Sequence, residues 1–224
     1  MTLPFPLSRM VQWMGPAVAA LALSACASVN TTNDTGTRVY AVGNDAATSF
    51  SSAKSCCASM AEFKYAPVAL PASIVTHIEN TNPAFNFTTG KSYFLAYKLP
   101  SSPKGLRLTI SSYPAGIIFF PNFLFLDATF TPTRQIGAPD THFVEPGTWE
   151  RGHYELTATL QPGDAARYLV ILTTDADLTG RHEVADSHFL MPAGGIYIPV
   201  SMGPYAHAHA PTGKIKLVVQ PLAP

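Results

Sequence analysis

Charged residues are scarce in this sequence. Only 12% of its 224 residues are charged, and the formal net charge at pH 7 is zero. So neutral a chain has no basic surface to attract the phosphate backbone of nucleic acid and no acidic surface to concentrate cations. The composition therefore argues against nucleic acid as a partner. The length fits one domain of moderate core.

Signatures of catalysis are also missing. The sequence contains no G-x-S-x-G nucleophile elbow and no C-x-x-C redox motif. A glycosidase needs two carboxylates held about 5–10 Å apart across the scissile bond, and no spacing of acids marks such a pair. Asp127, at the end of an apolar run, is expected to bond the backbone of a turn instead. We predict a protein that is not an enzyme and needs no cofactor, with a glycan-active hydrolase as a less favoured alternative.

The sequence lacks an apolar run long enough to cross a membrane. The longest N-terminal stretch, Met10 to Ala22, is interrupted by Gln12, Gly15 and Pro16. It is shorter than the roughly 20 residues that a spanning helix requires. We interpret residues 1–25 as a cleaved signal peptide.

The end of this stretch indicates how the signal is processed. The run Leu23-Ser24-Ala25-Cys26 closely resembles the lipobox of bacterial lipoprotein precursors. The mature chain would then begin at Cys26, with palmitate-type acyl chains anchoring it in a membrane. Ala27 follows where inner-membrane retention would favour Asp, so the pattern indicates the outer membrane, with the protein facing the periplasm. An ordinary secretory signal is the alternative.

Cysteine is rare, with three in the chain. Acylation of Cys26 would leave Cys56 and Cys57 as an adjacent pair. Neighbouring Cα atoms lie about 3.8 Å apart, below the usual disulfide range of roughly 4.4–6.8 Å, so a bridge between them would be strained and easily reduced. We favour a vicinal disulfide that locks a turn. The alternatives are free or partner-linked thiols and, less favoured, a metal or redox site.

The remaining composition indicates β structure. The chain holds 20 prolines and 15 glycines among many Thr, Val, Ile, Phe and Tyr residues, as in short strands joined by turns. Residues 26–52 are polar and are predicted to form the acylated N-terminus and a flexible tether. Residues 53–224 are predicted to form one all-β domain, an antiparallel β-sandwich. Its first segment, Ala53 to Phe63, could form a short helix or turn.

Several segments have the pattern of strands. Ile117 to Leu126 is apolar on both faces around Pro121, as expected of a central strand with a bend. The turn signal at 161–164 predicts that Tyr154–Leu160 and Arg167–Thr173 form an antiparallel hairpin. Thr174 to Asp177 is predicted to begin a capped helical turn. The other expected strands are Ser73–Ile78, Lys91–Leu99, Gly105–Ser111 and Lys214–Val219.

An aromatic side chain offers one route to a ligand, because a flat ring can stack on the apolar face of a sugar. Trp149, with His142 and Phe143 upstream, lies in a loop between expected strands and is the best candidate for glycan contact. The competing interpretation is ordinary packing over the edge of the sandwich.

The sequence His207-Ala208-His209 would place two imidazoles on one side of an extended segment, which is a weak metal-binding pattern. No third ligand is indicated, since His142, His153, His182 and His188 are scattered. We therefore favour an exposed loop between the last two strands and predict no metal site.

The second half of the chain resembles a known family. The ordered segments Phe120–Asp127, Phe143–Gly147, Tyr168–Leu178 and Thr212–Leu217 are similar to those of the maltose operon periplasmic protein family, the MalM-like proteins. This resemblance implies an envelope location and an association with maltose or maltodextrin uptake. It implies no catalytic residue. The lipobox is a departure, because the namesake looks like a soluble periplasmic protein.

Together these patterns predict an outer-membrane lipoprotein with a periplasmic β-sandwich domain. We expect it to act as a non-enzymatic accessory in maltose- or maltodextrin-type uptake or glycan binding. The alternative is a structural envelope lipoprotein that binds a protein partner.

Overall fold

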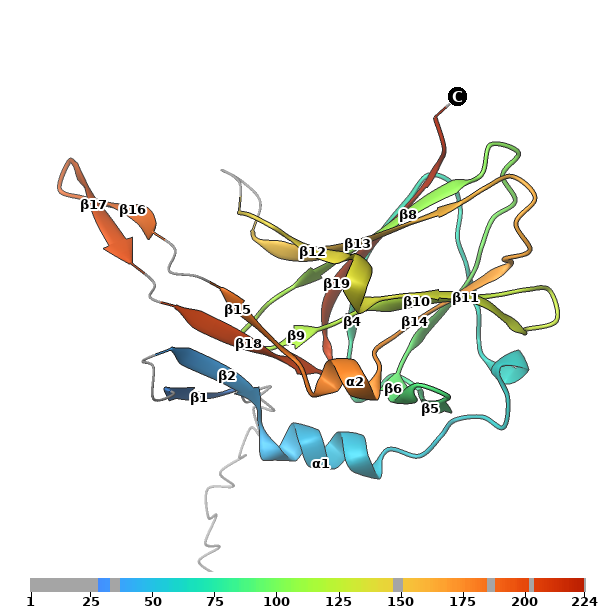
Figure 1. Cartoon of the computed structure of the whole chain (residues 1–224), viewed down its shortest axis with the longest axis horizontal. Coiled ribbons are helices and arrows are strands. Elements are labelled where there is room, and N and C mark those ends of the chain that lie inside the picture. The colour runs from blue at the N-terminus through green and yellow to red at the C-terminus, as the bar shows by residue number, and fades with distance from the viewer. Residues whose placement is uncertain (1–27, 33–36, 147–150, 185–187, 202–203, 224) are drawn as a thin grey trace, which may run out of the picture.

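Two five-stranded sheets pack face to face and form the body of the protein (Figure 1). The computed structural model describes residues 28–32, 37–146, 151–184, 188–201 and 204–223. In the first sheet every neighbouring pair is antiparallel. Its order is β12 (Thr141–Val144), β13 (His153–Leu160), β8 (Leu106–Tyr113), β19 (Gly213–Pro221) and β4 (Ala72–Ile78).

The second sheet faces the first. It is antiparallel except at one edge, where a two-residue strand runs parallel to its neighbour. Its order is β11 (Pro132–Ile136), β10 (Asn122–Leu126), β14 (Tyr168–Leu172), β7 (Leu95–Lys98) and β3 (Ala66–Pro67). The predicted all-β antiparallel sandwich is therefore confirmed.

The main core lies between these sheets and follows from the alternation of apolar residues along each strand. From the first sheet, Leu108, Ile110 and Leu217 are fully buried. They belong to one cluster with Phe123 and Ile171 of the second sheet. This shared cluster is what makes the two sheets one domain.

The second sheet is buried on its outer face too. All five residues of β10 are buried, and Leu124, Leu126 and Val170 point away from the main core into a second cluster. The segment between residues 53 and 65 and the hairpin of β5 (Ala84–Phe87) and β6 (Gly90–Tyr93) supply further members of that cluster. The expectation that Ile117–Leu126 is buried on both faces is confirmed, with β9 (Ile118–Phe119) and β10 separated at Phe120-Pro121.

A third sheet extends beyond the sandwich, at the left of Figure 1. Part of it comes from the segment predicted as a tether. β2 runs parallel to β18, and Tyr40 stacks on His207 at 5.9 Å between ring centroids. The helix α1 (Asn44–Ser52) follows, and Phe50 packs against Tyr93. The sheet consists of β1 (Ser28–Thr32), β2 (Arg38–Val42), β18 (Tyr205–Ala210) and β15 (Arg181–Val184), with β9 also paired to β18.

Two local predictions were wrong. The turn at 161–164 forms, with Gln161 N donating to Asp164 Oδ2 over 2.8 Å, but β13 and β14 belong to different sheets. It is therefore a connection between the layers of the sandwich and not a β-hairpin. The predicted strand Lys91–Leu99 is divided at Phe94, whose backbone N donates to Pro83 O.

Other local predictions are confirmed. Thr174 and Asp177 form a reciprocal capping box at the start of α2 (Asp175–Leu178). Residues 60–62 form a short 3₁₀ helix, η1 (Met60–Glu62), within the segment expected to be a short helix or turn. No helix in the described ranges combines the length and apolarity needed to cross a membrane.

Candidate functional site

A cleft of about 280 Å³ lies on the outer face of the second sheet. Its floor is apolar, because Leu124 of β10 and Phe87 of β5 are both largely buried. Its rim is polar and is supplied mainly by the exposed edge strand β11. The lining residues are Met60, Phe87, Thr88, Thr89, Leu124, Pro132, Thr133, Arg134 and Gln135.

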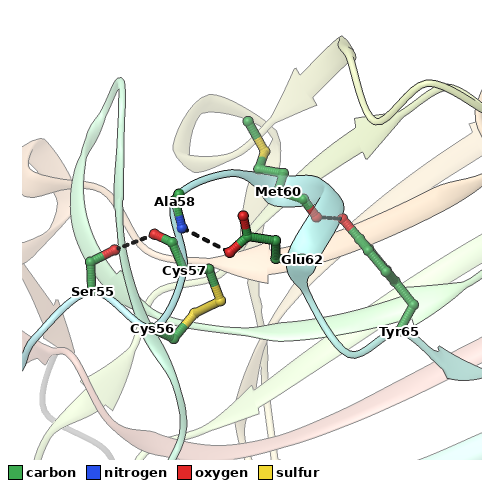
Figure 2. Close-up of a disulfide and its surroundings, with 7 residues drawn as sticks. All are labelled: Ser55, Cys56, Cys57, Ala58, Met60, Glu62 and Tyr65. Atoms are coloured by element: carbon green, nitrogen blue, oxygen red, sulfur yellow. Dashed lines mark hydrogen bonds between the residues drawn. A yellow bond between two sulfur atoms is a disulfide. The ribbon is translucent and has the colours of Figure 1, made fainter.

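One wall of the cleft belongs to the segment that carries the adjacent cysteines (Figure 2). Cys56 and Cys57 are joined by a disulfide, with their Cα atoms 3.8 Å apart. Ser55 Oγ donates to Cys57 O over 3.2 Å, and Ala58 N donates to Glu62 Oε2 over 3.0 Å. The disulfide thus lies in a short loop before η1, with Cys57 O bonded within the loop and Ala58 N bonded to a side chain of η1.

The cysteine loop is also attached to the rest of the domain. Cys56 N donates to Ala84 O of β5 over 2.8 Å. On the other side, Lys91 Nζ donates to Ser51 O and Ala53 O, each over 2.8 Å. These bonds fix the path of the chain from α1 toward η1, and so the approach of the chain to Met60 at the cleft.

Aromatic rings of the domain pack against the segment between residues 53 and 65. Phe63 packs against Phe94 with ring centroids 4.1 Å apart and meets Phe85 edge to face at 5.0 Å. Tyr65 contacts Tyr168 at 4.5 Å, and its hydroxyl donates to Met60 O over 2.8 Å. Burial, with the nearby Tyr168 as a smaller cause, raises the pKa of Tyr65, so this hydroxyl stays protonated and keeps donating.

Two residues of the polar rim, Thr133 and Gln135, are held in place by bonds to the neighbouring strand, β10. Thr133 Oγ1 donates to Phe125 O over 3.2 Å, and Gln135 Nε2 approaches Asn122 Oδ1 at 3.4 Å. Arg134 Nη2 donates to Thr159 O over 2.9 Å while its guanidinium lies 5.1 Å from the centre of the Phe125 ring. The Arg134 guanidinium therefore lies on the core side of the second sheet. The cleft on the outer face combines an apolar floor with amide and hydroxyl groups, a combination that suits an uncharged polyhydroxylated ligand.

The residues predicted for glycan contact lie elsewhere, on β12. His142 is exposed and lies 3.9 Å from Glu155 Oε1, whereas Phe143 is half-buried against Tyr154 at 4.9 Å. Trp149 lies outside the described residues, as does the predicted lipid-bearing Cys26. Of the three predicted glycan contacts, the structure thus places two side by side on one strand, away from the cleft.

The two histidines of the His207-Ala208-His209 motif are not in an exposed loop. They lie in β18 and are 7% and 6% exposed, which corrects that expectation. His207 Nδ1 is 2.8 Å from Gly116 O, and His209 Nδ1 is 2.6 Å from Asp177 O. Backbone carbonyls therefore orient both rings. In the described part of the chain no group of three or more His, Cys, Asp or Glu side chains is placed to hold a metal ion.

The sequence did not predict that a third histidine, His182, contacts His209. His182 of β15 lies with its Nδ1 2.9 Å from His209 Nε2. Because Asp177 O can only accept, His209 must carry its proton on Nδ1, and its Nε2 then accepts from His182 Nδ1–H. Phe120 lies over His209, with the two rings almost parallel at 4.3 Å. A Cβ at Gly180 would be 2.8 Å from His209 Nδ1, so only glycine fits there without a shift.

Burial lowers the pKa of all three histidines. For His182, the neighbouring His209 and His207 add to this effect. For His207 and His209, the bonds to Gly116 O and Asp177 O oppose it without reversing it. His182, His207 and His209, here called the histidine network, are therefore held in their neutral form.

Two of the acidic side chains, Asp127 and Asp177, accept hydrogen bonds that give them structural roles. Asp127 Oδ1 accepts from Thr129 Oγ1, Thr129 N and Thr131 N at 2.7–3.0 Å, which confirms its role in the turn. These bonds, led by the one from the Thr129 hydroxyl, lower the pKa of Asp127. Buried Asp177 accepts from Asn122 Nδ2 over 2.7 Å and from Thr174 Oγ1 over 2.6 Å, so it stabilises α2 and β10.

The histidine network predicts a pH-dependent stability. An unfolded histidine titrates near about 6.5, and the folded pKa is lower, so the unfolded chain binds more protons as the pH falls below that value. We expect the free energy of unfolding, measured by urea titration, to fall between about pH 7 and pH 5. Its slope against pH should correspond to the uptake on unfolding of at most about one proton per histidine. His207→Gln should reduce the slope.

A matched control for this experiment is Ala206→Gly, at a buried neighbour in the same strand. It should lower stability by the same amount at each pH and leave the slope unchanged. A stability that stays constant or increases on acidification would contradict the assignment of neutral histidines.

The cysteine loop predicts a simple chemical result. Because Cys56 is exposed, alkylation of the native protein without reductant tests the bond directly. Mass spectrometry should find neither Cys56 nor Cys57 labelled, and both labelled after reduction. Two labelled thiols before reduction would exclude the vicinal bridge.

Comparison with known proteins identifies the family. A family model described as "Maltose operon periplasmic protein precursor (MalM)" matches residues 89–219. Searches of curated proteins and of solved structures returned no match to the chain. The matched segment includes β10 and β11, which line part of the cleft, and β15 and β18, which carry the histidine network. Since it covers more than half of the 224 residues, the chain belongs to the MalM family.

Proposed function

We propose that this protein is a non-enzymatic accessory of carbohydrate uptake that faces the periplasm, is anchored through acylated Cys26 and binds a glycan in the cleft beside the cysteine loop. Family membership is the observation that carries this proposal. The family description supports a periplasmic location and names the maltose operon as the context. A maltose- or maltodextrin-type oligosaccharide is therefore the first ligand to test.

The cleft supports the proposal through its chemistry. A sugar ring has an apolar face of C–H groups and an edge of hydroxyls. Leu124, Phe87 and Met60 offer an apolar surface for the first, and Thr133 and Gln135 offer donors and acceptors for the second. Small-molecule sites usually have volumes of about 300–1,000 Å³, so a cleft of about 280 Å³ suits part of a chain such as one or two rings.

A second place for the glycan is the strand β12 with the loop that follows it. His142 is exposed there and Phe143 is half-buried, so an aromatic platform at this place would depend on Trp149. The two places can be separated by substitution, because they are formed by different sheets.

Calorimetric titration with a series of maltodextrins tests the glycan proposal. We expect binding in the micromolar to millimolar range. Gln135→Ala and Thr133→Ala should each weaken it by about 2–10-fold, the equivalent of one hydrogen bond worth about 0.5–1.5 kcal/mol. Trp149→Ala should leave it unchanged if the cleft is the site.

Arg107→Ala is the control, because Arg107 is an exposed residue of β8 in the opposite sheet. Its affinity should equal that of the parent chain. Loss of affinity in Trp149→Ala alone would move the site to the β12 loop. No binding of any glycan at millimolar concentration would overturn the proposal.

The lipid anchor is supported by the Leu23-Ser24-Ala25-Cys26 pattern and by the periplasmic context of the family. Metabolic labelling with an alkyne-tagged fatty acid tests it. The parent chain and Cys57→Ala should both take up the label, and Cys26→Ala should lose all of it. An unlabelled parent chain, or label retained in Cys26→Ala, would refute acylation at this residue.

A further inference from the structure

The hairpin of β16 (His188–Ala193) and β17 (Ile196–Ser201) is the most exposed apolar part of the described chain. Tyr197, Ile196, Met191 and Ile198 are 70%, 65%, 46% and 42% exposed. Figure 1 shows the hairpin extending away from the sheets, beyond the ends of β15 and β18. Contiguous exposed apolar groups of this kind mark a surface that meets a partner.

Both faces of the hairpin tip are uncovered. Met191 pairs with Ile198 across the hairpin, and Ile196 lies two residues along the same strand, so these three share one face. Tyr197 points to the opposite face. A flat protein interface would cover one face and leave the other in water, whereas a fluid apolar phase covers both.

The strand edges of the hairpin are poorly suited to pairing with another chain. The two-residue turn at Gly194-Gly195 makes Ala193 and Ile196 a hydrogen-bonded pair. Because hydrogen-bonded and non-hydrogen-bonded pairs alternate, the backbone nitrogens of the next pair, 192 and 197, and of the pair 190 and 199 point outward from the hairpin. Residues 192 and 199 are prolines, which have no N–H to donate. One outward donor is thus missing from each edge, a device that blocks strand addition.

The composition of the hairpin matches a lipid environment. From His188 to Ser201 the chain has no Asp, Glu, Lys or Arg. At about 3.3 Å per residue, the three steps along the strand from Met191 to Gly194 span about 10 Å, close to the depth of about 5–10 Å reached by interfacial segments. Tyrosine, with a ring and a hydroxyl, is typical of the membrane interface.

We infer that the tip of the β16–β17 hairpin inserts into the interface of a phospholipid bilayer. The tip consists of Met191, Gly194, Gly195, Ile196, Tyr197 and Ile198. Its position in the fold is suitable, because β15 and β18 join the hairpin to the same sheet as β1, which begins at Ser28. If Cys26 is acylated as proposed above, Ser28 is within about 7 Å of the anchor along the chain, which brings that sheet to the bilayer.

Depth-dependent fluorescence quenching tests the inference on the full chain. Tyr197→Trp reports from the tip, and Val75→Trp is the matched control, because Val75 is 58% exposed on β4 of the sandwich. The signal of the native tryptophan of the mature chain, Trp149, is subtracted with the parent chain. The lipid is phosphatidylcholine vesicles with and without phosphatidylglycerol, prepared with acyl chains brominated near the headgroup.

We expect quenching and a blue shift of emission for Tyr197→Trp and neither for Val75→Trp. Addition of Ile196→Asp and Ile198→Asp to Tyr197→Trp should abolish both effects, since a charge in the interface is unfavourable. Because Ile196 and Ile198 are exposed in the described part of the chain, these variants should keep the parent melting temperature. Quenching at neutral pH should be equal with and without phosphatidylglycerol, since the hairpin has no Lys or Arg.

Three results would overturn the inference: no quenching of Tyr197→Trp, equal quenching of Val75→Trp, or a blue shift without lipid that grows with protein concentration. The last would assign the tip to a second copy of the chain. The Cys26→Ala background separates this inference from the anchor proposal. In that background, quenching at position 197 after addition of excess vesicles supports insertion of the hairpin tip although the chain is not acylated. An acylated chain that shows no quenching rejects insertion of the tip and leaves the anchor proposal intact.

Discussion

The burial of both faces of β10 and β14 is the constraint on which the rest of the structure depends. Phe123 and Ile171 close the core between the sheets, while Leu124 and Val170 need a cover on the outside. The described residues form no long helix that could supply it, and the cover is built largely from the 53–65 segment and the β5–β6 hairpin. The disulfide loop, the bonds from Lys91 and the rings around Phe63 all serve to hold that cover in place. The cleft is the gap left where the cover ends, at the edge strand β11.

The histidine network serves a comparable purpose at the other side of the sandwich. β18 continues through Pro211 into β19, so the same segment of chain passes from the third sheet into the first. Asp177 O, His209 and His182 form a directed chain of hydrogen bonds that connects α2, β18 and β15. Every donor in this chain has one acceptor, which specifies a single arrangement in a buried place where an unpaired group would be costly. The base of the β16–β17 hairpin is thereby held by a well-defined support.

The sequence predicts the layers better than their connections. Strict alternation in residues 106–110 and the doubly apolar run around Pro121 predict burial correctly, because side-chain period is a local property. Ser111 is buried where the alternation predicts exposure. The turn at 161–164 was misassigned to a hairpin, because the same turn can return a strand beside its neighbour or send it to the facing sheet. His182 could not be linked to His209 from spacing, since their contact depends on the register of β15 and β18. The cleft could not be found either, because its lining comes from four separate parts of the chain.

The arrangement has a consequence for how the two proposed interactions would coexist. The cleft belongs to the β10–β11 side of the second sheet, whereas the β16–β17 hairpin extends from the third sheet at the opposite end of the molecule (Figure 1). A bilayer that received the hairpin tip would therefore lie away from β11. The cleft would stay open to solvent while the domain was held at the membrane. A soluble oligosaccharide could then reach the polar rim without displacing lipid, so neither interaction would need to release the other.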